Sequence, residues 1–155
     1  MSHQTIIYGY IEGRVWRKED YRKYQARNIE IVSKLPDEDA DPHFVNGIFA
    51  SKMPNENTKQ GTFKTHILHF GVSLKTRGLD QRDIWIAKFE ELLRRLYWGT
   101  AIVHIDTEIY GSYKYEWRIK LEKIVSNYDV EELSPTTNWK RLVFSNGEVI
   151  ESVDT

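Results

Sequence analysis

The order in which the hydrophobic period changes along the chain is the feature that most constrains its fold. Segments with the period of a strand alternate with segments with the period of a helix in the order strand, helix, strand, strand, helix, strand. These segments are Gln4–Glu12, Lys18–Leu35, Phe44–Ser51, Thr62–Leu74, Gln81–Tyr97 and Ala101–Asp106. The order predicts an α+β two-layer sandwich with a βαββαβ kernel, an antiparallel sheet and helices on one face.

The C-terminal third adds further strands to this kernel. Apolar and polar residues alternate without a break in Ser112–Leu121, which is typical of an antiparallel strand with one solvated face. Trp139–Phe144 and Glu148–Val153 flank Asn146-Gly147, the strongest short signal for a β-hairpin. We therefore expect one globular domain over residues 1–155, with extra C-terminal strands that extend or cover the sheet.

Local signals place the helix ends. Pro36 stops the first helix, because proline disfavours helical backbone before it. Asp80 is the expected N-cap of the second helix, and Gly99 is well placed to end it. Trp85 and Phe89 begin the apolar stripe of that helix, which Leu92, Leu93 and Leu96 complete, whereas Glu90 is expected on its solvated side.

Composition and charge narrow the class of protein. The chain has no cysteine, its N-terminus lacks a signal region, and no apolar run reaches the roughly 20 residues of a membrane helix. A cytoplasmic protein is therefore expected. The net charge is −1, whereas proteins that bind nucleic acids are usually basic. Five Trp, nine Tyr and six Phe make aromatic side chains the first candidates for a binding surface.

Histidines provide two candidate chemical sites. His66 and His69 would share a metal only on a helix, because a three-residue step in a strand places side chains on opposite faces. His104 and Asp106 share one face of a strand, where the carboxylate would orient a general base. Such a pair is also common as a purely structural contact, and the chain offers no cysteine and no Gly-x-Ser-x-Gly nucleophile motif.

Two further motif classes bear on nucleotides and nucleic acids. The glycines form no Gly-x-Gly-x-x-Gly pattern and no Walker loop, so no cofactor is expected. Tyr8 and Tyr10 share one face of the first strand, as stacking residues do in RNA-binding sheets. The third strand has His66, Leu68 and Phe70 where such sheets carry a basic-glycine-aromatic run.

Acidic residues form the strongest candidate for a partner-binding surface. Four carboxylates lie within five positions, and they favour either a simple solvated loop or a surface that attracts a basic partner. A second acidic spot follows later, and an aromatic anchor lies between the two. These candidate residues are Asp37, Glu38, Asp39, Asp41, Tyr110, Glu131 and Glu132, with Trp16 and Tyr128 as further aromatic candidates.

One stretch, about a quarter of the chain, resembles immunity proteins encoded beside bacterial polymorphic or contact-dependent toxins. The likeness lies in a Phe-Gly-x-Ser-Leu-Lys strand end, a Trp/Phe/Leu helix and a buried strand. These are His66–Lys75, then Trp85, Phe89–Leu93 and Leu96–Trp98, and finally Ala101. The resemblance implies a non-enzymatic cytoplasmic inhibitor of one cognate toxin domain, and it transfers no individual functional residue.

The leading hypothesis is therefore an immunity-type binding protein that occludes the active or substrate-binding face of a toxin domain. Its expected partner is a basic toxin domain, with no catalytic residue, metal or cofactor in the chain itself. Two alternatives stay open: a small enzyme that uses His104 and Asp106, and a nucleic-acid-binding sheet that uses Tyr8 and Tyr10.

Overall fold

The computed structural model describes residues 3–13, 21–37, 44–50, 66–75, 79–120 and 138–154. These residues form an α+β structure with two α-helices, one short 3₁₀ helix and a single seven-stranded sheet. The strands are β1 Gln4–Glu12, β2 Phe49–Ala50, β3 Ile67–Lys75, β4 Thr100–Thr107, β5 Gly111–Ile119, β6 Trp139–Ser145 and β7 Glu148–Asp154. The predicted α+β class is confirmed.

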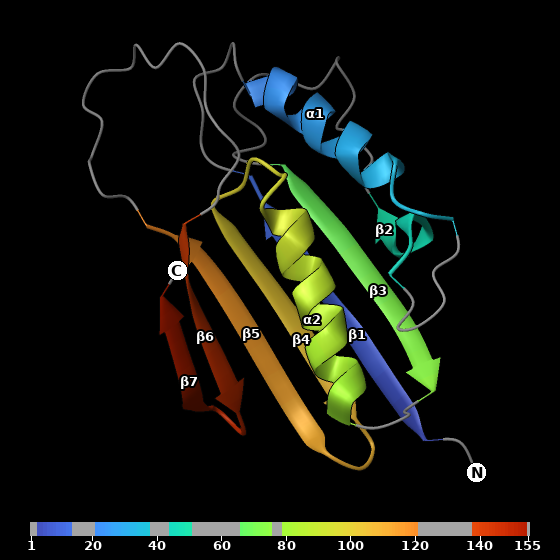
Figure 1. Ribbon diagram of the computed structural model, residues 1–155, viewed down its shortest axis with the longest axis vertical. Coiled ribbons are helices and arrows are strands. Elements are labelled where there is room, and N and C mark those ends of the chain that lie inside the picture. Colours follow the sequence, from blue (N-terminus) through green and yellow to red (C-terminus); the bar gives the residue numbers. More distant parts are fainter. Residues whose placement is uncertain are drawn as a thin grey trace.

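The strands are arranged in the order β2-β3-β1-β4-β5-β6-β7, and every neighbouring pair is antiparallel (Figure 1). The C-terminal strands therefore extend the sheet beyond β4. Strand β1 has the predicted bounds, and it lies between β3 and β4. The predicted Thr62–Leu74 strand begins at Ile67 in the structure, and residues 62–65 lie outside the described part of the chain.

The sheet has one buried face and one more exposed face. Ile7 and Ile11 of β1 are buried, whereas Ile6 and Tyr8, which flank Ile7 and point to the opposite face, are exposed. The same alternation buries Val103 and Ile105 of β4 and leaves His104 between them only half-buried. We call the face that carries Tyr8 and His104 the open face.

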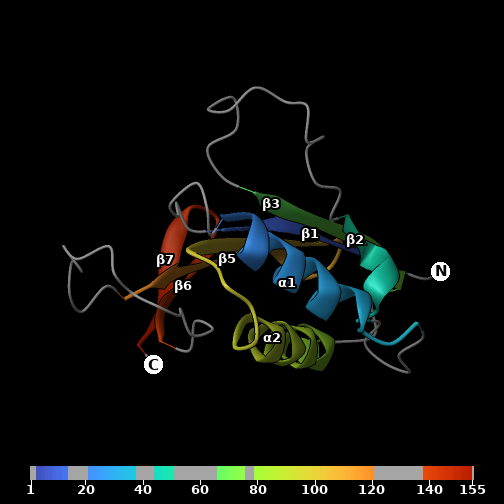
Figure 2. The same ribbon diagram turned by 90° about the horizontal axis from the view of Figure 1, so that it is seen from above.

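Helix α2, Leu79–Leu93, covers the buried face (Figure 2). Its Trp85 and Phe89 are fully buried and make ring contacts with Phe70 of β3, and Phe89 also contacts Trp117 of β5. The predicted apolar stripe is thus confirmed, because Leu92, Leu93 and Leu96 are fully buried as well. This packing joins the helix to the centre of the sheet.

Helix α1, Tyr21–Ser33, is held against the chain that follows α2. The buried side chain of Asn28 donates from Nδ2 to the carbonyl oxygen of Tyr97 at 2.8 Å. Its Oδ1 accepts from the backbone N–H of Tyr97 at 2.9 Å. A buried backbone unit is thereby satisfied by a residue 69 positions away, which fixes α1 beside the end of α2.

The ends of α2 differ from their predicted positions. The helix begins at Leu79, so Asp80 is its second residue rather than its N-cap. It ends at Leu93 rather than Tyr97, and the Trp98 indole donates to the Leu93 carbonyl at 2.8 Å. Gly99 does not end the helix: its N–H donates to Glu12 and its carbonyl accepts from Ile119. It therefore lies between β1 and β5 at the start of β4.

The segment predicted as a strand over Phe44–Ser51 is mostly not a strand. Residues Asn46–Ile48 form a 3₁₀ helix, and of the described residues 44–50 only Phe49–Ala50 pair with β3, while Ser51 lies outside the described part of the chain. The reason is a tether to the end of α1, because the Asn46 side chain donates to the Leu35 carbonyl and to Asp37. The Asn46 backbone N–H also donates to the Pro36 carbonyl at 3.1 Å.

The C-terminal hairpin is confirmed. Asn146 and Gly147 both have positive φ angles, 53° and 81°, as a two-residue hairpin turn requires. The turn joins β6 to β7, which is the outermost strand on its side of the sheet (dark red in Figure 1). Strand β7 is therefore one of the two edge strands of the described sheet.

Candidate functional site

The acidic cluster is described at one of its four predicted members. Asp37 is exposed just beyond α1, and its Oδ1 accepts a hydrogen bond from Asn46 Nδ2 at 2.8 Å. Glu38, Asp39 and Asp41 lie outside the described residues, as do Glu131, Glu132, Trp16 and Tyr128. The participation of these residues in partner binding stays a prediction.

Tyr110 is displayed on an ordered turn between β4 and β5. The Thr107 hydroxyl accepts from the Tyr110 N–H at 2.8 Å and donates to the Gly111 carbonyl at 2.7 Å. Tyr110 and its neighbour Ile109 are both exposed.

The open face joins two candidates that the sequence analysis treated separately. His104 of β4 lies directly opposite Tyr8 of β1, and their rings stack with centroids 4.8 Å apart and an interplanar angle of 14°. Partial desolvation raises the pKa of Tyr8, and Asp106 adds to this through its negative charge and a hydrogen bond. Tyr8 therefore stays protonated beside His104 and Asp106, with 42% of its surface exposed.

His66 and His69 face different environments, as the strand assignment predicts. His66 is buried and its Nε2 has no hydrogen-bond partner, whereas His69 is exposed. Burial lowers the pKa of His66, and the charge of His69 lowers it further. Within the described ranges, no group of three histidine or carboxylate side chains is placed to hold a metal ion.

A pocket of about 300 Å³ lies between α2 and the three C-terminal strands. Its polar lining carries both signs of charge, with three carboxylates and two guanidinium groups. Apolar side chains from α2, β6 and β7 complete its wall. The lining residues are Arg82, Asp83, Ile86, Ala87, Glu90, Tyr115, Arg141, Val143, Ile150 and Glu151.

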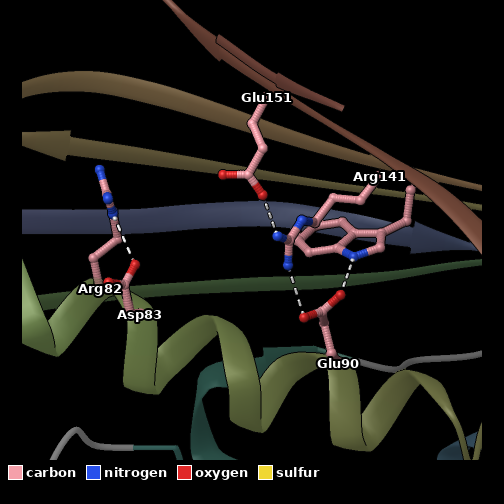
Figure 3. Close-up of polar contacts among 6 residues, drawn as sticks. Arg82, Asp83, Glu90, Arg141 and Glu151 are labelled. Carbon is pink, nitrogen blue, oxygen red and sulfur yellow. Dashed lines mark hydrogen bonds and ion pairs between the residues drawn. The ribbon is translucent and has the colours of Figure 1, made fainter. Parts of the chain in front are cut away.

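A chain of ion pairs crosses this pocket from the helix to the edge of the sheet (Figure 3). The Glu90 carboxylate accepts from Arg141 Nη1 at 2.9 Å and from the Trp117 indole at 3.0 Å. Arg141 Nη2 donates to the carboxylate of Glu151 on β7. One arginine of β6 therefore connects α2 with the edge strand, and its side chain is mostly buried.

Arg82 and Tyr115 also line the pocket, and Tyr113 contacts Arg82 from outside the lining. Arg82 lies over the Tyr113 ring, 4.3 Å from its centroid, and pairs with Asp83 at 3.4 Å. Burial raises the pKa of Tyr115, although the nearby Arg82 charge acts in the opposite direction. Tyr115 is therefore a neutral group in a pocket whose formal charge is −1, with three carboxylates against two guanidinium groups.

The pocket was not predicted from the sequence. Glu90 was expected on the solvated side of its helix, and no role was predicted for Arg141 or Glu151. A usable signal was present, because Arg141 alternates with Trp139 and Val143 and so shares their face of β6. An arginine on a buried face requires a carboxylate partner, but the sequence does not show which carboxylate reaches it.

Neither described helix is long and apolar enough to cross a lipid bilayer. Comparison with models of protein families, with curated proteins and with solved structures finds no match to this chain.

Proposed function

We propose that the protein is a non-enzymatic, immunity-type binding protein of the bacterial cytoplasm. It neutralises a cognate toxin domain by occluding the active or substrate-binding face of that domain. The observation that carries the proposal is that large apolar side chains are exposed in three places, on β1, on the β4–β5 turn and on the β7 edge, each a candidate contact surface. They are Ile6, Tyr8, Ile109, Tyr110, Val149 and Ile150.

Charge supports a basic partner. Asp37 is exposed, and the sequence places Glu38, Asp39 and Asp41 directly after it. Such a cluster raises the association rate with a cationic domain through long-range attraction. Exposed Tyr110 supplies an aromatic anchor of the type that is enriched among energetically important interface residues.

We also infer a βαββαβ kernel with both helices on one face, to which β5, β6 and β7 are added. The sheet order β2-β3-β1-β4 supports this arrangement. Helix α1 lies between β1 and β2 in the chain, and α2 lies between β3 and β4. Each helix thus connects two strands that have one other strand between them, which is the split β-α-β connection.

The test is capture of the partner followed by an assay of its toxicity. The tagged protein is incubated with lysate of its native cell, and the bound proteins are identified by mass spectrometry. We expect a basic, toxin-sized protein that stops bacterial growth when expressed alone, and growth that is restored when this chain is co-expressed. A captured protein that is harmless, or one that still stops growth in the presence of this chain, contradicts the proposal.

A second candidate function is binding of single-stranded nucleic acid by the open face. The observation that favours it is the exposed Tyr8 ring, held by its stack on His104 as a platform for a base. Fluorescence anisotropy with a labelled single-stranded oligonucleotide at low salt tests it. Binding that is lost in Tyr8→Ala supports this function, and no binding by the unmodified chain excludes it.

The third possibility, an enzyme that uses His104 and Asp106, gains Tyr8 as a neighbouring group. The raised pKa of Tyr8 disfavours its use as a base or nucleophile near neutral pH. A substrate screen with His104→Ala as the inactive control tests this alternative.

A further inference from the structure

Strand β7 forms an unusually open edge of the sheet. Among the described residues, this seven-residue strand pairs with β6 on one side only, through six of its residues, whereas the opposite edge strand β2 has two residues. An edge strand presents a row of backbone N–H and C=O groups that can pair with another chain. Within the described ranges, the longer edge of this sheet is therefore open to one more strand.

Strand β7 carries some of the features that protect an edge strand and lacks others. Six of its seven residues are exposed, and Val149 and Ile150 are 55% and 56% exposed. The strand contains no proline, lysine or arginine, but its three carboxylates and the bulge at Ile150 also protect an edge, so a chain of complementary charge is the one expected to pair with it. A register shift at Val143/Phe144 leaves Ile150 out of the pairing between β6 and β7, but the pairing is regular from Glu151 to Asp154.

The charge of β7 selects among possible occupants. The strand carries Glu148, Glu151 and Asp154 and no basic residue. Glu151 pairs with Arg141 and Asp154 with Lys120, so cations of this chain already offset two of the three charges. A symmetric dimer pairs two copies of the strand antiparallel, which places Glu151 opposite Glu151 and Glu148 opposite Asp154 when the copies are centred. Like charges directly opposite one another destabilise a sheet, so a second copy of this chain is disfavoured and a basic strand is favoured.

The pocket described above opens beside this edge. Ile150 and Glu151 of β7 belong to its lining, and its three carboxylates exceed its two guanidinium groups by one. Ile86 and Val143 add an apolar wall to the same pocket. A lysine or arginine side chain fits these properties, because its aliphatic stem packs on apolar groups while its charged end meets carboxylates.

We infer that β7 and the adjoining pocket bind an extended, basic segment of a partner protein as an eighth strand of the sheet. Backbone hydrogen bonds along β7 supply affinity, and a lysine or arginine of the segment enters the pocket and supplies specificity. This inference rests on the proposed function, since the segment belongs to the basic toxin domain. It names the surface through which that domain is held.

The test uses a synthetic peptide as the probe. A nine-residue peptide of alternating lysine and valine, blocked at both ends, is titrated into the ¹⁵N-labelled full chain and followed by NMR. We expect saturable shifts of the β7 amide signals and of the Trp117 indole N–H, which reports on the pocket because it donates to Glu90. A peptide of alternating glutamate and valine is expected to leave both sets of signals unchanged.

Charge reversal of one residue provides matched variants. Glu148→Lys on β7 is expected to weaken binding of the lysine–valine peptide roughly three- to tenfold, the range of an exposed ion pair turned into a repulsion. Glu91→Lys, an exposed carboxylate of α2, is expected to leave the affinity unchanged. Equal loss in both variants shows that only total charge matters, and it overturns the inference.

Three further outcomes contradict the inference. They are β7 signals that do not move, equal binding of the glutamate–valine peptide, and a dimer formed through β7 in analytical ultracentrifugation.

Measurements with the captured toxin distinguish a failure of the β7 site from a failure of the proposed function. A toxin that binds Glu148→Lys and Ile150→Arg variants with unchanged affinity refutes the β7 site and leaves the function intact. A peptide that binds β7 supports the site even where the captured protein is not toxic.

Discussion

At the scale of single residues, Glu90 connects α2 to the sheet through one carboxylate. It accepts from Trp117 of β5 and from Arg141 of β6, and Arg141 continues the chain of contacts to Glu151 of β7. The Glu90 and Arg141 side chains are only 15% and 18% exposed. Removal of a partner from a pair this shielded leaves a charge with poor solvation.

We therefore expect Glu90→Ala to lower the free energy of unfolding by about 1–3 kcal/mol. The reason is that the Trp117 indole and the Arg141 guanidinium would each lose a hydrogen-bond acceptor. Urea denaturation of the variant and the unmodified chain measures the change. Glu91→Ala, at the exposed neighbouring position, is expected to stay within about 0.5 kcal/mol. If Glu91→Ala lowered the free energy of unfolding as much as Glu90→Ala, the effect would come from a general change in helix α2 and not from the Glu90 contacts.

His66 makes stability depend on pH. Burial, and then the charge of His69, lowers the pKa of His66 below the ordinary value of 6.5. The unfolded chain thus takes up a proton at a pH where the folded chain does not, so the free energy of unfolding falls as the pH drops through and below 6.5. His66→Leu is expected to flatten this part of the stability profile.

Denaturant unfolding at a series of pH values between 5 and 8 measures the His66 profile. His69→Gln is the matched control, because it removes the smaller cause and leaves the burial of His66 in place. Most of the pH dependence is expected to persist in His69→Gln. A profile that is unchanged in His66→Leu would exclude His66 as the titrating group.

At the scale of elements, β1 and β4 approach so closely that only glycine fits at position 9. A Cβ atom added to Gly9 would lie 1.9 Å from the carbonyl oxygen of Ile102, so a strand of the sheet would have to move. The same atom added to Gly71 of β3 would meet nothing nearer than 3.9 Å. Two glycines in paired strands are therefore under very different constraints.

We expect Gly9→Ala to destabilise the protein by about 2–4 kcal/mol, because backbone cannot yield as a flexible side chain does. Gly71→Ala is expected to be neutral or slightly stabilising, since alanine reduces the entropy of the unfolded chain. Thermal unfolding of the two variants compares them directly. Similar melting temperatures for both would contradict the close approach of β1 and β4.

The elements that could be predicted are those whose pattern is local. Alternation in Gln4–Glu12 and the Asn146-Gly147 turn depend on neighbouring residues, and both agree with the structure. The end of α2 depends on Asn28, which binds the backbone of Tyr97 from another helix, so the apolar stripe alone extended the helix too far.

The candidate site was less predictable because its residues come from four elements. Glu116 of β5, next to the site residue Tyr115 but outside the pocket, presents the same difficulty. It was expected to be solvated by alternation, yet it is only 7% exposed, with Lys114 and Arg118 of its own strand paired to it. Its cross-strand neighbours Ile102 and Leu142 add cover on either side. Burial of this kind depends on the pairing register, which a single strand does not encode.

At the scale of the whole molecule, the described sheet presents surfaces of different character. One face is covered by α2, the open face carries Tyr8 with His104, and the β7 edge carries carboxylates beside exposed valine and isoleucine. The proposed function uses the β7 edge for contact and the acidic cluster after α1 for attraction. These two roles affect different measurements, since steering changes the association rate and direct contacts change the dissociation rate.

The acidic cluster is therefore expected to act on association. Reversal of Glu38, Asp39 and Asp41 to lysine, with Asp37 kept because it binds Asn46, should slow association with the captured toxin about tenfold at low salt. The salt dependence of the rate should flatten, because the removed attraction is the part that ions screen.

Stopped-flow measurements at several salt concentrations test both effects, with urea denaturation as the check on folding. Glu91→Lys is the control with unchanged kinetics. A triple variant that folds and associates at the original rate would remove the cluster from the mechanism, and the β7 edge would then have to account for recognition without steering.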